Sequence, residues 1–109
     1  MNDTELPNGI EAFFAAMNAQ DADAVAACFT AGARMRDEGR THVGPTDIAA
    51  WLKTASFERQ VVSTPRSFER DGGVDVVVAS IAGNFPGSPI DLPFRFRMKG
   101  RQISELEIG

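Results

Sequence analysis

A strict alternation of apolar and charged residues near the end of the chain is the feature that most constrains its fold. The two alternating sets are Leu92, Phe94, Phe96 and Met98, and Pro93, Arg95, Arg97 and Lys99. Successive side chains of a β-strand point to opposite faces, so this pattern predicts a strand that packs on a core with one face and meets water with the other. Such strands are typical of antiparallel sheets that are covered on one side.

A second segment is apolar on both faces of the strand that it predicts. Its two alternating sets are Val74, Val76 and Val78, and Val77, Ala79 and Ile81. A strand of this kind belongs in the interior of a sheet, and something must cover its second face. Turn signals at residues 71–73, 86–87 and 99–100 separate the strands in this half of the chain. We therefore expect four strands, over about residues 60–68, 74–84, 90–98 and 102–108.

The first half of the chain has helical spacing instead. A helix over about residues 8–19 is predicted by the apolar series Ile10, Phe13, Phe14 and Met17. Asp21 suits the N-cap of a second, shorter helix, which Gly32 would end and whose apolar side carries Val25, Cys28 and Phe29. Pro45 begins a third helix, over about residues 45–55, with the core-facing residues Ile48, Trp51, Leu52 and Ala55. Three helices followed by antiparallel strands indicate an α+β fold.

Length and composition indicate a single domain over residues 1–109. A chain of 109 residues can bury a core without disulfides, and its single cysteine excludes an intramolecular one. The net charge of −4, with acids and bases interspersed, argues against nucleic acid or an anionic membrane as the main partner. The apolar runs fall short of the roughly 20 residues that span a bilayer, and the sequence opens with no leader pattern. We expect a soluble, cytoplasmic protein.

One carboxylate is predicted to point at the core. If Ala33-Arg34-Met35-Arg36-Asp37 forms a strand, Asp37 shares the inward face with Ala33 and Met35. A buried aspartate needs a hydrogen-bond partner or has a chemical role. A two-residue turn at Gly39-Arg40 would place it opposite His42, the only histidine, whereas a turn centred on Glu38-Gly39 would break that pairing. If Asp37 and His42 are paired, they could exchange a proton or form a structural hydrogen bond at the rim of the sheet.

Other reactive or charged residues give weaker signals. Cys28 lies on the apolar side of its helix without a basic neighbour, which favours core packing over a nucleophilic role. The bases at positions 59, 66, 95, 97, 99 and 101 form a stripe that a solvated face or a dimer rim explains without nucleic acid. One histidine and one cysteine cannot furnish a common zinc site, and no glycine-rich phosphate loop is present. We expect no metal and no cofactor.

The order and spacing of several motifs resemble the nuclear transport factor 2-like or SnoaL-like superfamily, which includes polyketide cyclases and ketosteroid isomerase. The resemblance is carried by Phe-Phe-Ala-Ala-Met-Asn-Ala-Gln-Asp at residues 13–21, followed by Phe29, the 33–37 strand, Gly44 and residues 48–51. It implies a cone-shaped fold, in which three N-terminal helices pack on a strongly curved, mostly antiparallel sheet, with a pocket at the open end and frequent homodimers. It does not imply one reaction, because the superfamily includes enzymes and non-enzymes.

The resemblance also implies roles for single residues. Asp37 stands where ketosteroid isomerase-like members carry their general base. The tyrosine of that isomerase would fall at Phe13, and this chain contains no tyrosine. The assisting acid would fall near Leu92, with Asp91 one residue away and, by strand parity, on the outer side. Because losing one such donor costs about 100-fold to 1,000-fold in rate, steroid isomerisation is not expected.

Two hypotheses for function follow. In the first, the protein is a non-catalytic module that holds a small apolar molecule. In the second, it is an isomerase, cyclase or dehydratase in which Asp37 acts as general base on a carbonyl compound and His42 supports it. The expected apolar ligand contacts are Phe13, Phe14, Met17, Met35, Trp51, Phe94 and Phe96. The doubly apolar strand at residues 74–81 further predicts a homodimer through the sheet.

Overall fold

The computed structural model describes residues 6–109 and has three helices beside one six-stranded sheet. The helices are α1 (Asn8–Asn18), α2 (Ala22–Ala27) and α3 (Pro45–Leu52), and a π-helical turn, η1 (Lys53–Phe57), continues α3. The strands are β1 (Phe29–Asp37), β2 (Arg40–Val43), β3 (Val62–Asp71), β4 (Val74–Ala82), β5 (Ile90–Lys99) and β6 (Gln102–Ile108). The predicted α+β class is confirmed.

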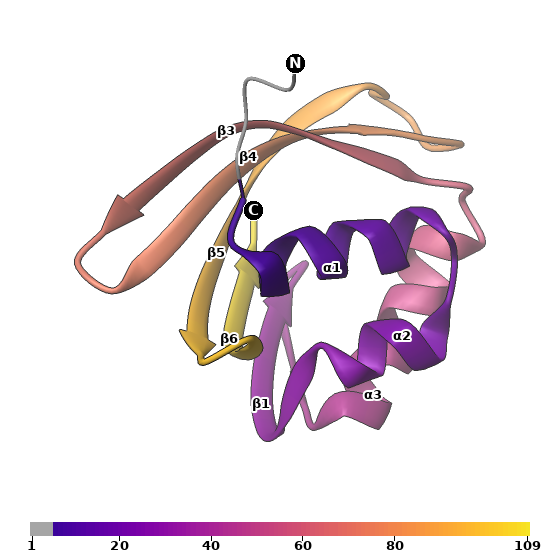
Figure 1. Cartoon of the computed structure of the whole chain (residues 1–109). Helices are drawn as coiled ribbons and strands as arrows, with labels where there is room; N and C mark the ends of the chain where they lie inside the picture. The colour runs from indigo at the N-terminus through magenta and orange to yellow at the C-terminus, as the bar shows by residue number, and fades with distance from the viewer. Residues whose placement is uncertain (1–5) are drawn as a thin grey trace.

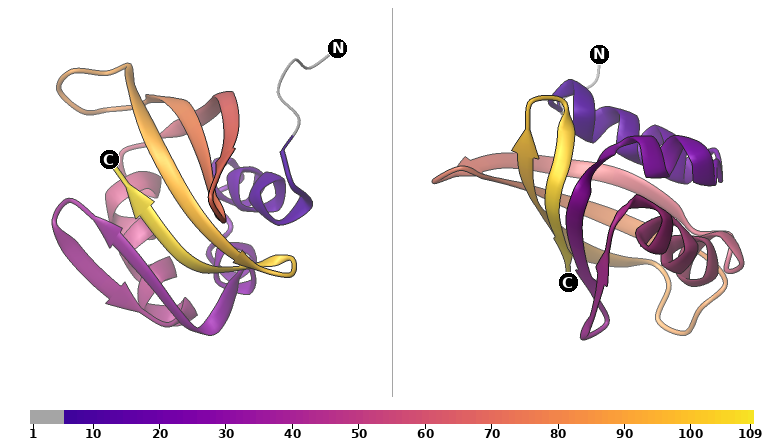
Figure 2. Two further views of the ribbon diagram at one scale, coloured as in Figure 1. Left: turned by 90° about the vertical axis from the view of Figure 1, so that its left-hand side faces the viewer. Right: turned by 90° about the horizontal axis from the view of Figure 1, so that it is seen from below.

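The sheet has the strand order β2-β1-β6-β5-β4-β3. All neighbouring strands are antiparallel except β1 and β6, which are parallel. The sheet bends round α1, and α2 and α3 lie beside α1 at its open side (Figures 1 and 2). This arrangement is the cone that the family resemblance implies.

The alternation of the two predicted strands matches their burial. Phe94 and Phe96 of β5 are buried, whereas Arg95 and Arg97 between them are exposed. Strand β4 lies between β3 and β5, as expected of a segment that is apolar on both faces. Its Val77, Ala79 and Ile81 are buried in the core, and its other valines are half-buried on the outer face of the sheet.

Several element boundaries differ from the sequence prediction. Helix α2 ends at Ala27 rather than near Gly32, because Phe29 pairs with Ile103 of β6 and the chain enters the sheet. The backbone N–H of Ile103 donates to the carbonyl oxygen of Cys28 at 2.8 Å, and a bulge between Phe29 and Arg34 takes up the extra residues. The third strand starts at Val62 instead of residue 60 and runs on to Asp71, where it continues to pair with β4.

The capping of the helices agrees in part with expectation. The Asp21 side chain accepts a hydrogen bond from the Ala24 backbone N–H at 3.1 Å, as predicted for the α2 N-cap. Pro45 opens α3 as predicted, but regular α-helix stops at Leu52, three residues early. None of the helices in residues 6–109 is long and apolar enough to cross a membrane.

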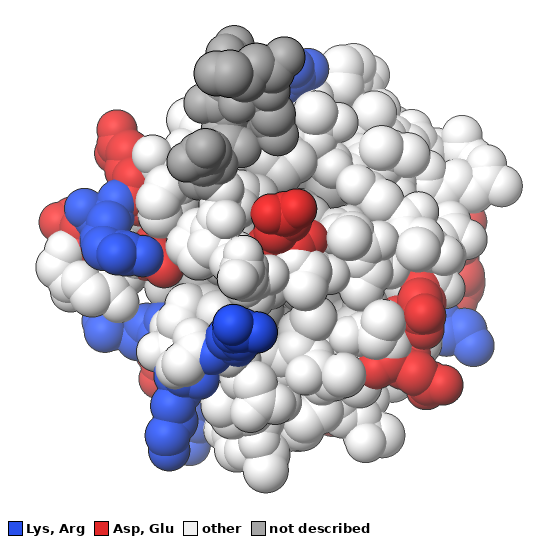
Figure 3. Space-filling view, in the orientation of Figure 1, with Lys and Arg blue, Asp and Glu red and all other residues white. Residues whose placement is uncertain are grey.

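Aromatic rings fill the centre of the cone. Phe13 of α1 packs edge-on against Phe14, Phe29 and Phe96, with ring centroids 5.3 to 5.9 Å apart. Phe14 meets Phe94 in the same way at 5.1 Å. Edge-to-face contacts of this kind hold α1 against β5, because aromatic rings prefer this geometry to a face-to-face sandwich. Over the described residues of the face shown in Figure 3, charged side chains are sparse in the middle and gather at the margins.

Candidate functional site

A cavity of about 180 Å³ lies between the sheet and the C-terminal end of α1. Most of its wall is apolar and comes from α1, from the strands β4 and β5, and from the segments on either side of them: Met17, Val61, Ile81, Phe85, Leu92 and Phe94. The exposed residues of the lining are the charged Glu38 and Arg59 and the apolar Ile90, and they form the rim of the cavity. The cavity therefore has an apolar interior and a charged mouth.

Asp37 is the carboxylate that reaches this cavity. It is the last residue of β1 and is half-buried, and its Oδ2 accepts a hydrogen bond from Trp51 Nε1 at 3.0 Å. Burial raises the pKa of the Asp37 carboxyl above its ordinary value, although the Trp51 hydrogen bond acts in the opposite direction. A carboxyl in this environment accepts a proton more readily than one in water.

Trp51 links Asp37 to the histidine. Its ring stacks on His42, with centroids 4.8 Å apart and an interplanar angle of 20°. The Nδ1 atom of His42 lies 3.5 Å from Asp47 Oδ2, and the guanidinium carbon of Arg40 lies 5.7 Å from the Trp51 centroid. These residues come from β1, β2 and α3, so the hairpin and the helix are joined by this cluster.

The predicted turn at Gly39-Arg40 is wrong. The turn lies at Glu38-Gly39, so Asp37 pairs with Arg40 and His42 pairs with Met35. Both turn residues have positive φ, 52° at Glu38 and 75° at Gly39, as the commonest two-residue hairpin requires. Asp37 and His42 still share the inner face of the sheet, but Trp51 connects them in place of a direct hydrogen bond.

The seven apolar contacts expected from the sequence fall into three groups. Met17 and Phe94 line the cavity with Asp37. Trp51 touches the carboxylate itself. The other four are packed in the core and do not line the cavity: Phe13, Phe14, Met35 and Phe96.

Several lining residues were missed by the sequence analysis. Ile81 and Leu92 face the cavity because they share the inner face of the sheet with Val77 and Phe94, so strand parity alone could have found them. Phe85 and Arg59 lie between strands, and no periodicity places such residues. Asp91 is exposed and Leu92 lines the cavity, as parity predicts.

The cavity lacks the donors that the isomerase-like assignment would need. Phe13 occupies the position implied for the tyrosine, and it is fully buried in the aromatic core. The position implied for the assisting acid is Leu92, which is apolar. Among residues 6–109, no cluster of three or more His, Cys, Asp or Glu side chains could hold a metal ion.

A curved sheet closed by three helices, with a cavity between them, defines a cone-shaped α+β protein. A family model described as the SnoaL-like domain matches residues 10–106. The chain belongs to the SnoaL-like domain family. No curated protein matches the sequence.

Solved structures support this assignment. A Sinorhizobium meliloti protein, provisionally described as a polyketide cyclase, is 35% identical over 95% of both chains, with a TM-score of 0.90. A Catenulispora acidiphila protein with a ketosteroid isomerase-like fold, in complex with trimethylamine, is 22% identical over 96% of this chain and 86% of its own (TM-score 0.81). An NTF2-like protein from Cytophaga hutchinsonii is 12% identical over 99% and 93% (TM-score 0.77). The last two share the fold.

Proposed function

We propose that the protein binds a small, mainly apolar molecule in the cavity beside Asp37. The observation that carries this proposal is the combination of apolar walls with one half-buried carboxylate. Binding sites for small molecules are typically apolar pockets with a few polar groups that fix the orientation of the ligand. Here Asp37 supplies that polar group, and Glu38 and Arg59 lie at the mouth.

The volume of the cavity limits the size of the ligand. An apolar cavity of about 150 Å³ holds one benzene molecule, so 180 Å³ fits a molecule with a single ring or a similar number of atoms. A four-ring steroid is far larger. The group of the ligand that meets Asp37 is a hydrogen-bond donor or a cation, because an ionised carboxylate only accepts. The Catenulispora relative is described in complex with a small amine, which belongs to this class of ligand.

Nuclear magnetic resonance (NMR) titration of the ¹⁵N-labelled protein tests the proposal. The ligands are trimethylamine and a panel of single-ring amines and phenols, which carry a donor or a cation, together with single-ring ketones, which serve the second candidate below. We expect shifts in the signals of cavity residues such as Met17 and Phe94, weaker binding in Asp37→Asn, and loss of binding in Ile81→Trp, which fills the cavity. Asp91→Asn is the matched control, because it makes the same change on the outer face. Absence of cavity shifts at millimolar ligand concentrations would refute the proposal.

A second candidate function is proton transfer by Asp37. It is favoured by the burial that raises the pKa of this carboxyl, since a general base works best when its pKa approaches the working pH. In this reaction Asp37 removes a proton from the carbon next to a ketone, leaving an enolate, and then returns a proton to that carbon or, for a β,γ-unsaturated ketone, to the γ-carbon of the dienolate. No electrons are gained or lost.

Deuterium exchange separates the two candidates. Single-ring ketones that bind are incubated with the protein in D₂O, and loss of the α-hydrogen signal is followed by NMR. The second candidate predicts exchange that falls about 100-fold to 10,000-fold in Asp37→Asn and is unchanged in Asp91→Asn. Exchange at the uncatalysed rate with bound ketone would leave binding as the function.

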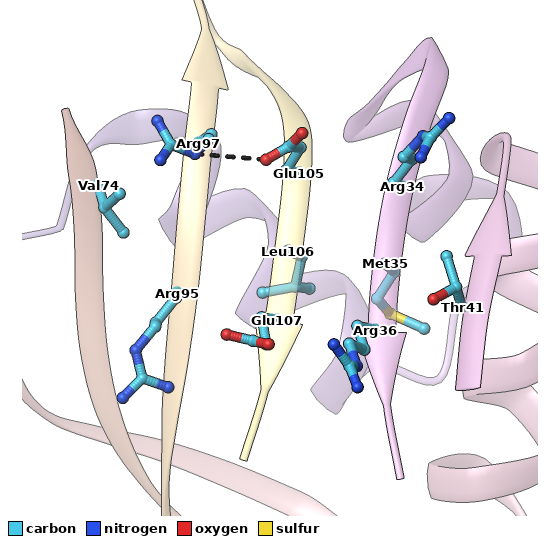
Figure 4. A pocket seen from close by; sticks show the side chains of 10 residues that line it. All are labelled: Arg34, Met35, Arg36, Thr41, Val74, Arg95, Arg97, Glu105, Leu106 and Glu107. Carbon is cyan, nitrogen blue, oxygen red and sulfur yellow. Dashed lines mark ion pairs between the residues drawn. The ribbon is translucent and has the colours of Figure 1, made fainter. Parts of the chain in front are cut away.

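We also propose that a second copy of the chain covers the outer face of the sheet. Figure 4 shows this face, where Val74 adjoins a groove of about 370 Å³ across β1, β6 and β5. Strand pairing arranges the charges of the groove in two rows, Arg97-Glu105-Arg34 and Arg95-Glu107-Arg36. Arg97 and Glu105 form an ion pair at 3.3 Å.

Charge distribution favours a second copy as the occupant. Each row has one arginine in excess, and β3 carries Glu69 and Asp71 on the same face, because they pair with Val76 and Val74. A two-fold related copy can therefore place its acids against these arginines while the valines are covered.

Analytical ultracentrifugation over a range of concentrations tests the dimer. We expect a dimer mass that Arg97→Glu shifts toward monomer and that Arg101→Glu, an equal charge change in the β5–β6 turn, leaves unchanged. A monomer mass at every concentration would refute the proposal. So would a monomer that gains mass only with an added acidic peptide.

A further inference from the structure

Trp51 lies at the centre of a cluster whose members come from three elements. Asp47 and Trp51 are four residues apart on α3, so their side chains lie on the same face of the helix. Arg40 and His42 are two residues apart on β2, so both point to the inner face of the sheet. Asp37 of β1 shares that inner face through its pairing with Arg40. The fold therefore brings one helix face against one strand face beside the cavity.

The contacts within this cluster form a series that ends at the cavity. Asp47 contacts His42 Nδ1, the imidazole stacks on the indole, and the indole N–H donates to Asp37 Oδ2. His42 has a side chain that is 14% exposed, and its Nε2 is buried without a hydrogen-bond partner among the described residues. The ring of His42 is thus used for stacking rather than for hydrogen bonds to the sheet.

We propose that His42 is a positioning residue that acts through Trp51, holding the indole so that its N–H is directed at Asp37. The orientation of an indole about its terminal side-chain torsion is broad unless neighbours restrict it. The stacked imidazole restricts it, and Asp47 holds the imidazole in turn. The proposal rests on the proposed function only in that Asp37 is taken as the polar group of the cavity.

The positioning has a chemical consequence. A hydrogen bond from the indole N–H stabilises the ionised carboxylate and so opposes the effect of burial on the pKa of Asp37. If the indole turns away, the carboxylate loses this donor and its pKa rises further. The charged or titratable groups that face His42 are Asp47 on α3, Asp37 beyond the indole, and Arg40 on its own strand. His42 would therefore set how strongly Asp37 holds a proton without touching a ligand.

A pair of substitutions at one position isolates the stacking. His42→Phe and His42→Ala both remove the imidazole nitrogens and any charge, but only His42→Phe keeps a ring that can stack on Trp51. The ligand-free protein is used throughout. Two quantities are measured by NMR: the hydrogen exchange rate of the single indole N–H, and the midpoint of the Asp37 carboxyl ¹³C titration.

The stacking proposal predicts a difference between the two variants. Indole exchange in His42→Ala is expected to be about twofold to tenfold faster than in His42→Phe, which is the factor that a stacked ring pair contributes. The Asp37 midpoint is expected to be higher in His42→Ala than in His42→Phe. Trp51→Phe, which removes the N–H and keeps a ring, should raise the midpoint relative to the wild type. Equal exchange rates and equal midpoints in the two His42 variants would overturn the proposal.

A third variant covers the case in which His42→Ala does not fold. Asp47→Ala removes the partner of Nδ1 and leaves both rings in place, so faster indole exchange than in the wild type is expected. An unchanged rate would overturn the proposal. Because no ligand is present in these measurements, failure of the cavity to bind a molecule would not affect them. Conversely, a negative result here would leave ligand binding beside Asp37 untouched.

Discussion

Replacement of Asn18 by alanine should destabilise the protein although the side chain is exposed. Asn18 is the last residue of α1, and its amide forms two hydrogen bonds with one residue of β3. Its Nδ2 donates to the Ser63 carbonyl oxygen at 2.9 Å, and its Oδ1 accepts from the Ser63 backbone N–H at 2.8 Å. Because β3 is at the edge of the sheet, the Asn18 side chain gives Ser63 the two hydrogen bonds that a further strand would otherwise provide.

The magnitude follows from the burial of Ser63. This residue is 4% exposed, so its backbone groups have limited access to water once the amide is removed. A typical hydrogen bond contributes about 1 kcal/mol, and a buried group left without a partner costs about 1–3 kcal/mol. Asn18→Ala leaves two such groups of Ser63 without a partner, and water near the exposed position 18 can partly hydrate them. We therefore expect the free energy of unfolding to fall by about 2 kcal/mol. For a chain of this size the melting temperature should fall by roughly 8 °C.

Urea unfolding followed by the fluorescence of Trp51 measures this loss. Asn84→Ala is the matched control, because Asn84 is also exposed and its side chain hydrogen-bonds the exposed Gln60 at 3.3 Å. That control should change the free energy of unfolding by less than about 0.5 kcal/mol. If Asn18→Ala loses no more stability than Asn84→Ala, with the same dependence on urea, the reasoning about Ser63 is wrong.

Three further predictions concern buried groups. Asp37→Asn should be more stable than the wild type at neutral pH, and the difference should vanish in acid. The folded state holds the Asp37 proton more tightly than the unfolded state, because burial raises the pKa of this carboxyl. The contribution of Asp37 to stability therefore falls as the pH rises from the ordinary to the raised pKa. Urea unfolding at several pH values, with Asp91→Asn as control, checks this. Gly9→Ala should cost about 1–3 kcal/mol, because its Cβ would collide with the Arg101 carbonyl oxygen and with Met98, whereas Gly32→Ala meets nothing and should be neutral. Burial raises the pKa of the Cys28 thiol, whose Sγ contacts the Ala24 carbonyl oxygen at 3.3 Å, so an aromatic disulfide reagent should modify it far more slowly in the native than in the unfolded protein. Equal rates would contradict this.

Hydrophobic periodicity was sufficient to predict the elements that pack on the core with a single face. The α1 stripe and the β5 alternation each face a single core, so their patterns give both type and direction. Periodicity failed to predict secondary structure where pairing with a strand distant in the sequence determines it. The segment after Ala27 has helical spacing, but pairing of Phe29 with β6, more than seventy residues away, draws it into the sheet. No local signal contains that information.

The candidate site shows the same division. Strand parity placed Asp37 on the inner face, and it does reach the cavity. The hairpin turn was misassigned because glycine can take either central position of a two-residue turn. In the structure Gly39 is the second central residue, and Glu38 takes the first with a positive φ. The hydrogen bond from Trp51 depends on the angle at which α3 crosses the hairpin, and the sequence does not determine that angle.

The position of β6 in the sheet has a consequence for how the chain folds. This strand is the last element of the sequence, yet it lies between β1 and β5 and joins the two halves of the sheet. Until β6 is present, the β1–β2 hairpin can pack on α3 but has no strand that links it to β5. The sheet cannot be completed before β6 is present, so the protein should fold slowly for its length, because contacts between distant segments form slowly.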